Sequence, residues 1–339
     1  MCGIVGILNL NDLPPVEPAV VRQMLTMLRH RGPDGFGIYR DAHIGMGNAR
    51  LSIIDLTGGD QPIGNEDGNL WTVYNGEVFN YVELRPQLEA HGHHFTTQTD
   101  TEVILHLYEE RGPQCLQLLN GQFALAIWNQ HERSLFLARD RAGIRPVFYA
   151  YHEGRLLFAS EIKSLLSVPG MQARVNRDAL REVFTHWSVQ PPRTIFEGIF
   201  ELPPAHYLIA RDGKVEITRY WDLDYSLEET PRDEDAYLEG LESLLIDATR
   251  IRLRADVPVG AYLSGGLDSS VTTALIRSYT GNRLDTFSIA FSDENYNESP
   301  YQNKMAGFLG TDHHEVYCTH ADIGAAFPDV IWHTETPIL

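Results

Sequence analysis

The first half of the chain is a series of short apolar runs separated by turn residues. Apolar runs of about four to eight residues, bounded by Gly, Pro, Asn or Asp, are typical of strands. Because strands outnumber helices here, we expect layered sheets with helices on the outside. The predicted strands cover Gly3–Leu10, Ile44–Leu51, Leu70–Tyr74, Phe123–Trp128, Leu135–Ala138, Val147–Tyr151 and Leu156–Ala159.

Helical signals are fewer in this half. Val20–Leu28 has apolar residues at helical spacing and is followed by a Gly-Pro pair, which stops helices. A second helix is predicted after Asn80, because a glutamate three residues on forms a capping-box pattern. The third covers Thr101–Arg111, with Asp100 as its expected N-cap.

From Asp233 the pattern changes to longer helices that alternate with apolar strands. An amphipathic helix to about Arg254 precedes a buried strand over Val257–Leu263. After a glycine turn, a helix to about Ser278 precedes a strand over Leu284–Phe291. Apolar strands that alternate with helices are typical of a parallel α/β sheet.

The stretch between these two patterns, Val168–Arg232, is rich in proline. It is predicted as a connector that carries small elements, with the domain border near residues 200–230. At 339 residues, two domains are the natural expectation. We therefore predict a first domain over 2–200, a connector over 201–232 and a second domain over 233–339.

Composition narrows the classes of function. Hydrophobic residues make up 43% of the chain, which is enough for extended cores. The net charge of -19 argues against nucleic acid as a main partner, since phosphate binding needs a basic surface. No apolar run approaches the roughly 20 residues that cross a membrane, and no leader precedes the fold. A soluble, cytoplasmic protein without a membrane partner is expected.

The chain begins Met1-Cys2-Gly3-Ile4. Removal of Met1 would leave Cys2 with a free α-amine, whose ordinary pKa of roughly 7.7–8.0 leaves much of it unprotonated near neutral pH. That amine can take the proton of the thiol, as in the terminal-nucleophile variant of the catalytic triad. The alternative is a cysteine that only happens to be second. Cys115 and Cys318 are expected to be packed thiols, and the three cysteines have no paired spacing that predicts disulfides or a zinc site.

Ser264–Ser270 reads Ser-Gly-Gly-Leu-Asp-Ser-Ser and joins a predicted strand to a predicted helix. Its glycines let the backbone approach a ligand closely, and the helix N-terminus offers unpaired N–H groups to an anion. The serine hydroxyls add donors, so the segment is suited to hold phosphate oxygens. It matches neither the Walker nor the dinucleotide pattern. The alternative is a glycine-rich helix start with a serine cap.

Two motifs together resemble a known family. The Ser264–Ser270 loop, after Asp-Val-Pro-Val-Gly at 256–260, resembles the pyrophosphate loop of ATP pyrophosphatases, and Met-Cys-Gly-Ile resembles class II glutamine amidotransferases. In this order they resemble glutamine-hydrolysing asparagine synthetases over the whole chain. The resemblance implies an α+β, Ntn-hydrolase-like first domain of layered antiparallel sheets with helices. It implies a second, α/β domain with a parallel sheet, similar to adenine nucleotide alpha hydrolases.

The resemblance assigns Cys2 as the nucleophile of a glutaminase, with its α-amine as base. Arg50 matches the arginine that holds the α-carboxylate of glutamine, since a guanidinium can grip a carboxylate with two hydrogen bonds. Asn75-Gly76 matches the oxyanion hole, and Asp100 matches the carboxylate that binds the α-ammonium. The implied glutamine-binding residues are Arg50, Leu51, Ser52, Ile53, Ile54, Asn75, Gly76, Glu77 and Asp100.

Each of these residues also has an ordinary structural explanation. Arg50 alone would be a surface arginine at a strand end, and Asn-Gly at 75–76 is a strong hairpin signal. Asp100 is equally well explained as a helix cap. The joint occurrence of the four features favours the glutaminase.

Other segments match the family less directly. Arg31–Gly35 is expected to shape a turn near the site, and Arg139–Pro146 and Ala159–Lys163 to face the synthetase domain. Relatives mostly have an aromatic residue and a lysine where Ala142 and Arg145 stand, a mild departure.

Two histidine runs are not predicted as metal sites. His91-Gly92-His93-His94 is expected to be an exposed turn, because no cysteine or carboxylate flanks it closely. His313-His314 is expected to be structural.

For the second domain, the resemblance implies an ATP-dependent ligase of asparagine biosynthesis. Glutamine would supply ammonia to aspartate activated as β-aspartyl-AMP, giving asparagine, glutamate, AMP and pyrophosphate, with ATP and Mg²⁺ required. Asp268 is the one candidate Mg²⁺ contact. The residues implied for ATP and pyrophosphate are Leu263, Ser264, Gly265, Gly266, Leu267, Asp268, Ser269, Ser270 and Ile289. Leu263 and Ile289 are equally explained as core strand residues.

The chain stops at Leu339 without the Gly-Glu-Gly-x-Asp-Glu segment of the family, so an incomplete second domain with an uncovered sheet edge is expected. Three alternatives stay open: amidation of another carboxylate, a fragment with glutaminase activity alone, and a non-catalytic binding protein. Sugar-phosphate and phosphoribosyl partner domains are disfavoured by the 264–270 loop. Homodimerisation is expected only from the resemblance.

Overall fold

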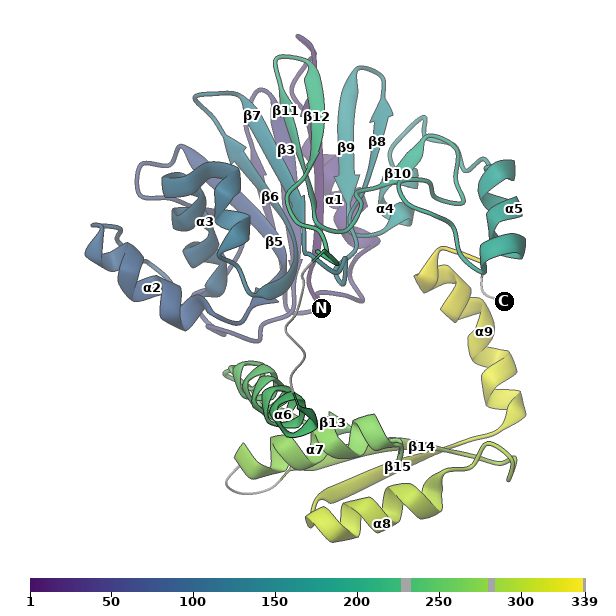
Figure 1. The fold of residues 1–339 in the computed structure, drawn as a ribbon. Coiled ribbons are helices and arrows are strands. Elements are labelled where there is room, and N and C mark those ends of the chain that lie inside the picture. Colours follow the sequence, from purple (N-terminus) through teal and green to yellow (C-terminus); the bar gives the residue numbers. More distant parts are fainter. Residues whose placement is uncertain (227–232, 280–283, 338–339) are drawn as a thin grey trace. The chain divides into compact units, whose positions relative to one another are not determined.

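The computed structural model describes residues 1–226, 233–279 and 284–337. Contacts within the chain divide it into two units. The first unit is Met1–Asp224 with Thr334–Leu339, and the second unit is Tyr225–His333. Figure 1 shows the elements of both units. The predicted borders of 2–200 and 233–339 stay predictions.

The first unit contains two antiparallel sheets. The first sheet has six strands in the order β10-β8-β9-β1-β3-β2. In it, β1 pairs with β3 and β9, which puts the N-terminal strand in the middle of the sheet. Its strands are β1 (Gly3–Asn9), β2 (Gly35–Arg40), β3 (Ile44–Arg50), β8 (Phe148–His152), β9 (Arg155–Ala159) and β10 (Ile199–Glu201).

The second sheet also has six strands, in the order β12-β11-β7-β6-β5-β4. β5 pairs with β6 along its whole length, from Leu70 opposite Asn129 to Val78 opposite Gly121. Its strands are β4 (Ile63–Gly64), β5 (Leu70–Val78), β6 (Gly121–Asn129), β7 (Ser134–Arg139), β11 (His206–Arg211) and β12 (Lys214–Arg219).

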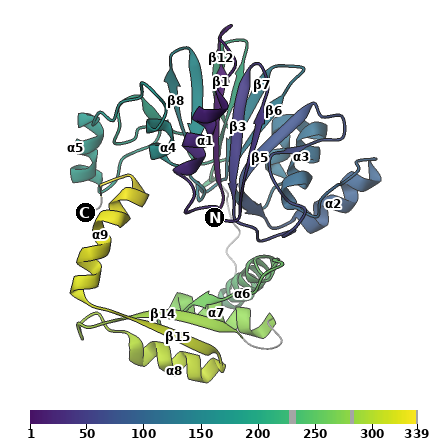
Figure 2. The same ribbon diagram turned by 180° about the vertical axis from the view of Figure 1, so that it is seen from behind.

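Three apolar clusters hold these layers together. One contains side chains from both sheets, such as Ile4 and Phe158 from the first and Leu137 from the second. Another lies between the second sheet and the helices α2 (Tyr81–Ala90) and α3 (Asp100–Arg111). The third lies between the first sheet and the helices α1 (Pro18–Thr26) and α4 (Ile162–Leu166), and Figure 2 shows α1 beside β1 and β3. The predicted layered sheets with outer helices are thus confirmed. A 3₁₀ helix at Gly112–Gln117 and α5 (Arg177–His186) complete the unit.

All the strands predicted in the first half are present, with ends that differ by a few residues. The largest difference is in β5, which continues to Val78, so Asn75-Gly76 lies inside a strand and forms no hairpin turn. A side chain at Gly76 would meet the neighbouring strand, because an added Cβ would lie 2.4 Å from the carbonyl oxygen of Gln122. The close approach of β6 therefore explains why glycine occupies position 76.

One predicted helix cap is wrong, and the other lacks the expected capping bond. The N-cap of α3 is Thr99, whose hydroxyl accepts a hydrogen bond from the N–H of Glu102, and Asp100 is the first residue of the helix. Asn80 precedes α2 but makes no capping bond. Its side chain bonds the turn at residues 118–120 instead, so a tertiary contact replaces the local one.

The stretch predicted as a connector, 201–232, contains regular structure. Its residues form the hairpin β11–β12, and β11 pairs with β7 from Tyr207 opposite Ala138 to Arg211 opposite Ser134. The connector was predicted to carry small elements, and this hairpin is one of them. Its pairing with a strand about 70 residues earlier was not predicted, and the borders of the connector stay a prediction. Residues 227–232 of the predicted connector lie outside the described residues.

The second unit has a parallel sheet of three strands, β13 (Ala261–Tyr262), β14 (Asp285–Phe291) and β15 (Asp312–Cys318), as predicted for the α/β domain. The strand predicted over Val257–Leu263 is much shorter, because only its last residues pair with β14 and Pro258 has no N–H to donate. The helices are α6 (Glu234–Ile251), α7 (Leu267–Tyr279), α8 (Ser299–Leu309) and α9 (His320–Thr334). No helix in the described ranges is long and apolar enough to cross a membrane.

Candidate active site

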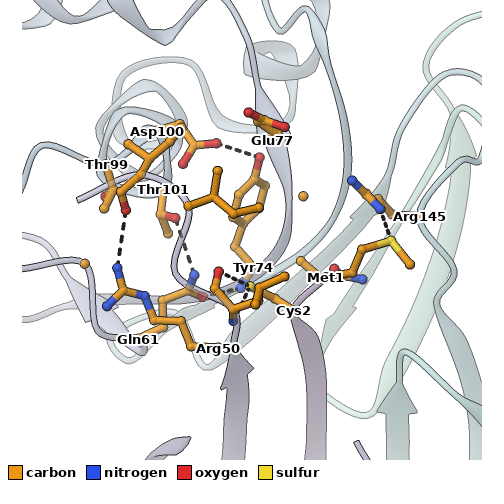
Figure 3. Close-up of a pocket in the computed structure, with 16 residues that line it drawn as sticks. Met1, Cys2, Arg50, Gln61, Tyr74, Glu77, Thr99, Asp100, Thr101 and Arg145 are labelled. Carbon is orange, nitrogen blue, oxygen red and sulfur yellow. Dashed lines mark hydrogen bonds between the residues drawn. The ribbon is translucent and has the colours of Figure 1, made fainter. Parts of the chain in front are cut away.

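A pocket in the first unit opens where β1 begins, β3 ends and α3 begins (Figure 3). Residues from six segments line it, although the segments are up to about 140 positions apart in the sequence. The lining residues are Met1, Cys2, Arg50, Leu51, Ile53, Ile54, Gly59, Gln61, Tyr74, Asn75, Gly76, Glu77, Thr99, Asp100, Thr101 and Arg145.

Cys2 lies directly before β1, and its sulfur faces the end of β3. The N–H of Leu51 donates to Sγ at 3.3 Å, and the thiol donates to the carbonyl oxygen of Leu51 at 3.6 Å. Burial raises the pKa of the Cys2 thiol, while the bond from Leu51 and the nearby α-amine oppose this effect. Burial also lowers the pKa of the α-amine, which belongs to Met1 in this chain. A lower amine pKa leaves more of the amine free to accept a proton near neutral pH.

Arg31 fixes the backbone of the cysteine. Its Nε donates to the carbonyl oxygen of Cys2 at 3.1 Å, and its Nη1 donates to the buried carboxylate of Glu161 at 2.7 Å. Asp34, in the same turn, accepts a hydrogen bond from the N–H of Ser52 at 2.8 Å. The Arg31–Gly35 turn therefore contacts the segments on both sides of the sulfur, in line with the role expected for it.

Asn75 is buried in β5, with 1% of its surface exposed. Neither its amide nitrogen nor its amide oxygen has a hydrogen-bond partner among the described residues. Buried polar atoms are nearly always paired, and an unpaired one needs an explanation. Asn75 lines the same pocket as Cys2, so its unpaired amide is a candidate partner for a ligand.

Asp100 is 5% exposed, and its carboxylate accepts hydrogen bonds from the hydroxyl of Tyr74 and the N–H of Val78, both at 2.9 Å. Figure 3 shows the Tyr74 contact. Burial raises the pKa of Asp100 to about 6, although these hydrogen bonds favour the charged form. At neutral pH the pocket therefore contains a buried negative charge.

Arg50, the last residue of β3, is buried and supplies the positive charge. Its guanidinium donates to Asp60 at 2.8 Å and to the carbonyl oxygens of Asp55 and Ile54 at 2.5 and 3.3 Å. Gly59 allows this packing, since a Cβ there would lie 2.5 Å from Nη2 of Arg50. The Asp60 side chain is 85% exposed, so this ion pair lies against solvent on one side.

Of the residues predicted for the glutaminase, all but Ser52 line this pocket. Sequence reasoning did not identify Gln61, Tyr74 and Thr101 as lining residues. Gln61 accepts a hydrogen bond from the N–H of Tyr74 at 2.7 Å and so fixes the strand beside Asn75. Tyr74 could have been found from its place directly before the Asn-Gly pair, whereas nothing local singles out Gln61. Arg145, expected to face the other domain, also lines the pocket and contacts the Met1 sulfur.

The two remaining cysteines lie away from this pocket. Cys115 is fully buried, and burial raises the pKa of its thiol to about 12, which agrees with a packed thiol. Cys318 ends β15 in the second unit and is partly exposed. His313, in β15, bonds Thr286 and Ser288 of β14 at 2.9 and 3.0 Å, which agrees with the expected structural role.

In the second unit, the 264–270 loop joins β13 to α7, as predicted. The Ser264 and Ser269 hydroxyls bond each other at 2.9 Å, and Ser269 also accepts from the N–H of Ser264. Gly265 has φ +82°, and a Cβ there would lie 2.8 Å from Cβ of Tyr301, so glycine is required. Asp268 lies in the exposed first turn of α7. Leu263 is buried, whereas Ile289 is 51% exposed, so the core explanation is wrong for Ile289.

Comparison with known proteins gives the same division of the chain. Residues 1–221 match the glutamine amidotransferase domain family, and residues 240–339 match the asparagine synthase family. In the solved structure of an allosteric regulatory enzyme of purine biosynthesis, 80% of the chain superposes on 93% of this one with a TM-score of 0.51. Its sequence identity is 17%, so this likeness concerns the fold alone.

Curated relatives cover the whole chain. Asparagine synthetase [glutamine-hydrolyzing] 1 of Bacillus subtilis is 34% identical over 100% of this chain and 53% of its own length. Putative asparagine synthetase [glutamine-hydrolyzing] 2 of Methanocaldococcus jannaschii is 35% identical over 99% of this chain and 68% of its own length. The chain thus spans about half the length of the Bacillus relative. It belongs to the family of glutamine-hydrolysing asparagine synthetases.

Proposed function

We propose that the first unit is a glutaminase in which Cys2 attacks the side-chain amide of glutamine. The observation that carries this proposal is the convergence of Cys2, Asn75, Arg50 and Asp100 on one pocket. The pocket offers a nucleophile, an unpaired amide, a cation and a buried anion. Glutamine has one group for each of them: an amide carbon, its oxygen, an α-carboxylate and an α-ammonium.

The substrate would be held at its amino-acid end. The Arg50 guanidinium would bind the α-carboxylate, which would replace part of the ion pair between Arg50 and the exposed Asp60. This replacement costs little, since an ion pair against solvent is worth only about 0–1 kcal/mol. The Asp100 carboxylate would bind the α-ammonium. These two contacts would aim the side-chain amide at the cysteine sulfur, which lies between the same segments.

The reaction would then proceed by acyl transfer. After removal of Met1, the α-amine of Cys2 takes the thiol proton, and the thiolate attacks the amide carbon. The amide oxygen becomes an oxyanion that accepts hydrogen bonds from the side chain of Asn75 and the N–H of Gly76. The tetrahedral intermediate expels ammonia, which takes up the proton held by the α-amine. Water hydrolyses the glutamyl thioester, releasing glutamate and restoring the thiol.

For the second unit, we propose ATP binding and formation of β-aspartyl-AMP from aspartate, with ammonia giving asparagine, AMP and pyrophosphate. The strand–loop–helix arrangement of 264–270 supports a phosphate-binding role, since the loop leads into the N-terminus of α7. The exposed Asp268 offers a single carboxylate, which fits Mg²⁺, a cation that binds with few protein ligands and several waters. Bound Mg²⁺ would neutralise polyphosphate charge. Leu263 and Ile289 are proposed nucleotide contacts.

The partners follow from this assignment as proposals: glutamine, aspartate and ATP as substrates, a homodimer as the assembly and the cytoplasm as the site of action. The alternatives are amidation of another carboxylate and glutaminase activity alone. Pyrophosphate release with another carboxylate but not with aspartate would favour the first, and no pyrophosphate release with any carboxylate would favour the second.

The deciding experiment measures glutamate release from glutamine without ATP. We expect activity in the wild-type chain and a loss of at least about 10³-fold in Cys2→Ala, because no other group in the pocket replaces the sulfur. Cys318→Ala, a substitution of a partly exposed cysteine in the second unit, serves as the matched control and should retain full activity. Mass spectrometry of the active protein should find Met1 removed. Unchanged hydrolysis in Cys2→Ala would overturn the assignment.

A further inference from the structure

A cluster of two histidines and two glutamates lies in the first unit, outside the pocket. It consists of Glu66 between β4 and β5, His93 after α2, and His106 and Glu109 on one side of α3. One ligand atom of each residue lies within 4.8 Å of the others. His93 was expected in an exposed turn, yet its side chain is only 14% exposed and its ring lies 4.6 Å from that of His106.

The two imidazoles present the same nitrogen to the same carboxylates. Nδ1 of His93 lies 3.5 Å from Glu66 and 3.7 Å from Glu109. Nδ1 of His106 lies 3.5 Å from Glu66 and 3.3 Å from Glu109. Ligand atoms about 2.0–2.1 Å from a tetrahedral zinc ion are about 3.3–3.4 Å apart, so these spacings are close to those of a metal site.

The other ring nitrogens also face carboxylates. Nε2 of His93 lies 3.5 Å from Glu110, and Nε2 of His106 lies 3.9 Å from Glu102. In metal sites a carboxylate behind each histidine orients the ring by accepting a hydrogen bond, and the two distances here are longer than such a bond. Nδ1 of His106 makes a hydrogen bond to Glu109 at 3.3 Å, whereas its Nε2 is buried and makes none within the described residues.

The negative charge around the cluster and its exposure to solvent also suit a bound cation. Four carboxylates surround two rings, and a divalent ion would offset the negative charge that neutral imidazoles leave. The His106 side chain is 1% exposed, whereas those of Glu66 and Glu109 are 35% and 31% exposed, which leaves an entry path from solvent. The mixed nitrogen and oxygen donors suit zinc and its first-row neighbours better than magnesium or calcium.

We propose that Glu66, His93, His106 and Glu109 bind one divalent transition-metal ion. The ion ties three segments of the first unit together: the β4–β5 turn, the loop after α2, and α3. Because α3 begins at Asp100, which lines the pocket, a bound ion would stiffen the helix that carries this carboxylate. The role is structural, and no chemical step depends on it.

The test uses the 339-residue chain in a Cys2→Ala background, so that the N-terminal thiol cannot take the metal. After treatment with a chelator, Zn²⁺ binding is measured by equilibrium dialysis and atomic absorption, and Co²⁺ binding by its visible spectrum. We expect one ion per chain, an intense Co²⁺ band typical of tetrahedral coordination, and a rise of the thermal unfolding midpoint on adding Zn²⁺.

Two ligand variants and one control locate the ion. His93→Gln and Glu66→Gln should each weaken Zn²⁺ binding at least about tenfold and lose the Co²⁺ band. His94→Gln changes an exposed histidine next to His93 and should bind as before. Both ligand variants are at partly exposed positions, so folding is checked by their unfolding midpoints without metal. Absence of binding, or binding unchanged in both variants, would refute the site. Neither result affects the glutaminase proposal, which depends on Cys2.

Discussion

The two units bury very different amounts of apolar side chain. The first unit has three clusters between its sheets and under its helices. Among its described residues, the second has one small cluster of Ala261, Ile276 and Leu284, with Leu253 packed against it. No residue of α9 is buried, and α6 buries only Ile251. Because apolar burial is the main favourable term in folding, the first unit is stabilised by its own core far more than the second.

The candidate sites differ in the same way. Asn75, Asp100 and Arg50 are each at most 6% exposed and are held by strands or by a helix that pack on large clusters. The 264–270 loop is largely exposed and follows a two-residue edge strand. A site built on rigid, buried elements keeps its geometry without a ligand. The site proposed for glutamine is therefore preformed within its own unit, whereas the loop proposed to bind the nucleotide has few contacts to fix it.

The largest expected effect tests the difference between the cores with a matched pair of phenylalanines. Phe158→Ala removes a fully buried ring from the cluster between the sheets and should cost about 3–5 kcal/mol of unfolding free energy. Phe287→Ala removes a ring that is 42% exposed in β14 and should cost about 1 kcal/mol. Urea unfolding followed by tryptophan fluorescence and circular dichroism measures both. Equal losses would mean that the second unit has a core comparable to the first.

The second prediction concerns Asn75 in the pocket of the first unit. Asn75→Ala should lower kcat for glutamine hydrolysis by about 10²–10³-fold, because one oxyanion donor is lost. ATP binding to the second unit should not change. Stability should change little, since the Asn75 amide makes no hydrogen bond within the described residues. Asn80→Ala is the control, because it breaks bonds to the 118–120 turn and should lower stability while kcat stays the same.

The smallest effect concerns the buried charge of the first site. The pKa of Asp100 is raised to about 6, so below that pH the carboxylate takes up a proton and loses its attraction for the α-ammonium. KM for glutamine should therefore rise about tenfold for each pH unit below about 6. Steady-state kinetics between pH 4.5 and pH 8 measure this change. Asp100→Asn should have a high KM that no longer depends on pH in this range, and a wild-type KM independent of pH would contradict the assignment.

Local sequence patterns predicted seven of the twelve described strands of the first unit, because apolar periodicity is a local property. They did not predict β2, β4, β10, β11 and β12. Pairing over long distances was not predictable in the same way. The pairing of β11 with β7 was not predictable, because β7 lies about 70 residues earlier. The β11–β12 hairpin itself has a local signal that was overlooked, since Asp212-Gly213 joins its two strands. Thr99 caps α3 because Asp100 is drawn to Tyr74 and Val78 on a neighbouring strand, a contact that no local rule contains.

Candidate chemistry was indicated where a residue type and its neighbours form a motif, as with Cys2, the Asn-Gly pair and the 264–270 loop, and the roles of these residues stay proposals. Gln61 acts by holding a strand in place, so no motif marks it, whereas Tyr74 stands directly before the Asn-Gly pair and bonds Asp100. The histidine cluster was missed for a related reason. Its four members are spread over 44 positions, from Glu66 to Glu109 inclusive, and only the packing of α3 against its neighbours brings them together.

Burial of Asp100 also links substrate binding to folding. A carboxyl group whose pKa in the folded chain is raised from 3.8 to about 6 stabilises the fold below pH 3.8, and this contribution is lost as the pH rises through 6. At neutral pH the empty pocket therefore lowers the stability of the first unit. An ammonium group beside Asp100 would offset that loss. Glutamine should thus act as a ligand that protects the first unit against heat and proteases at pH 7. The ligand-free protein should be degraded faster when its substrate is scarce.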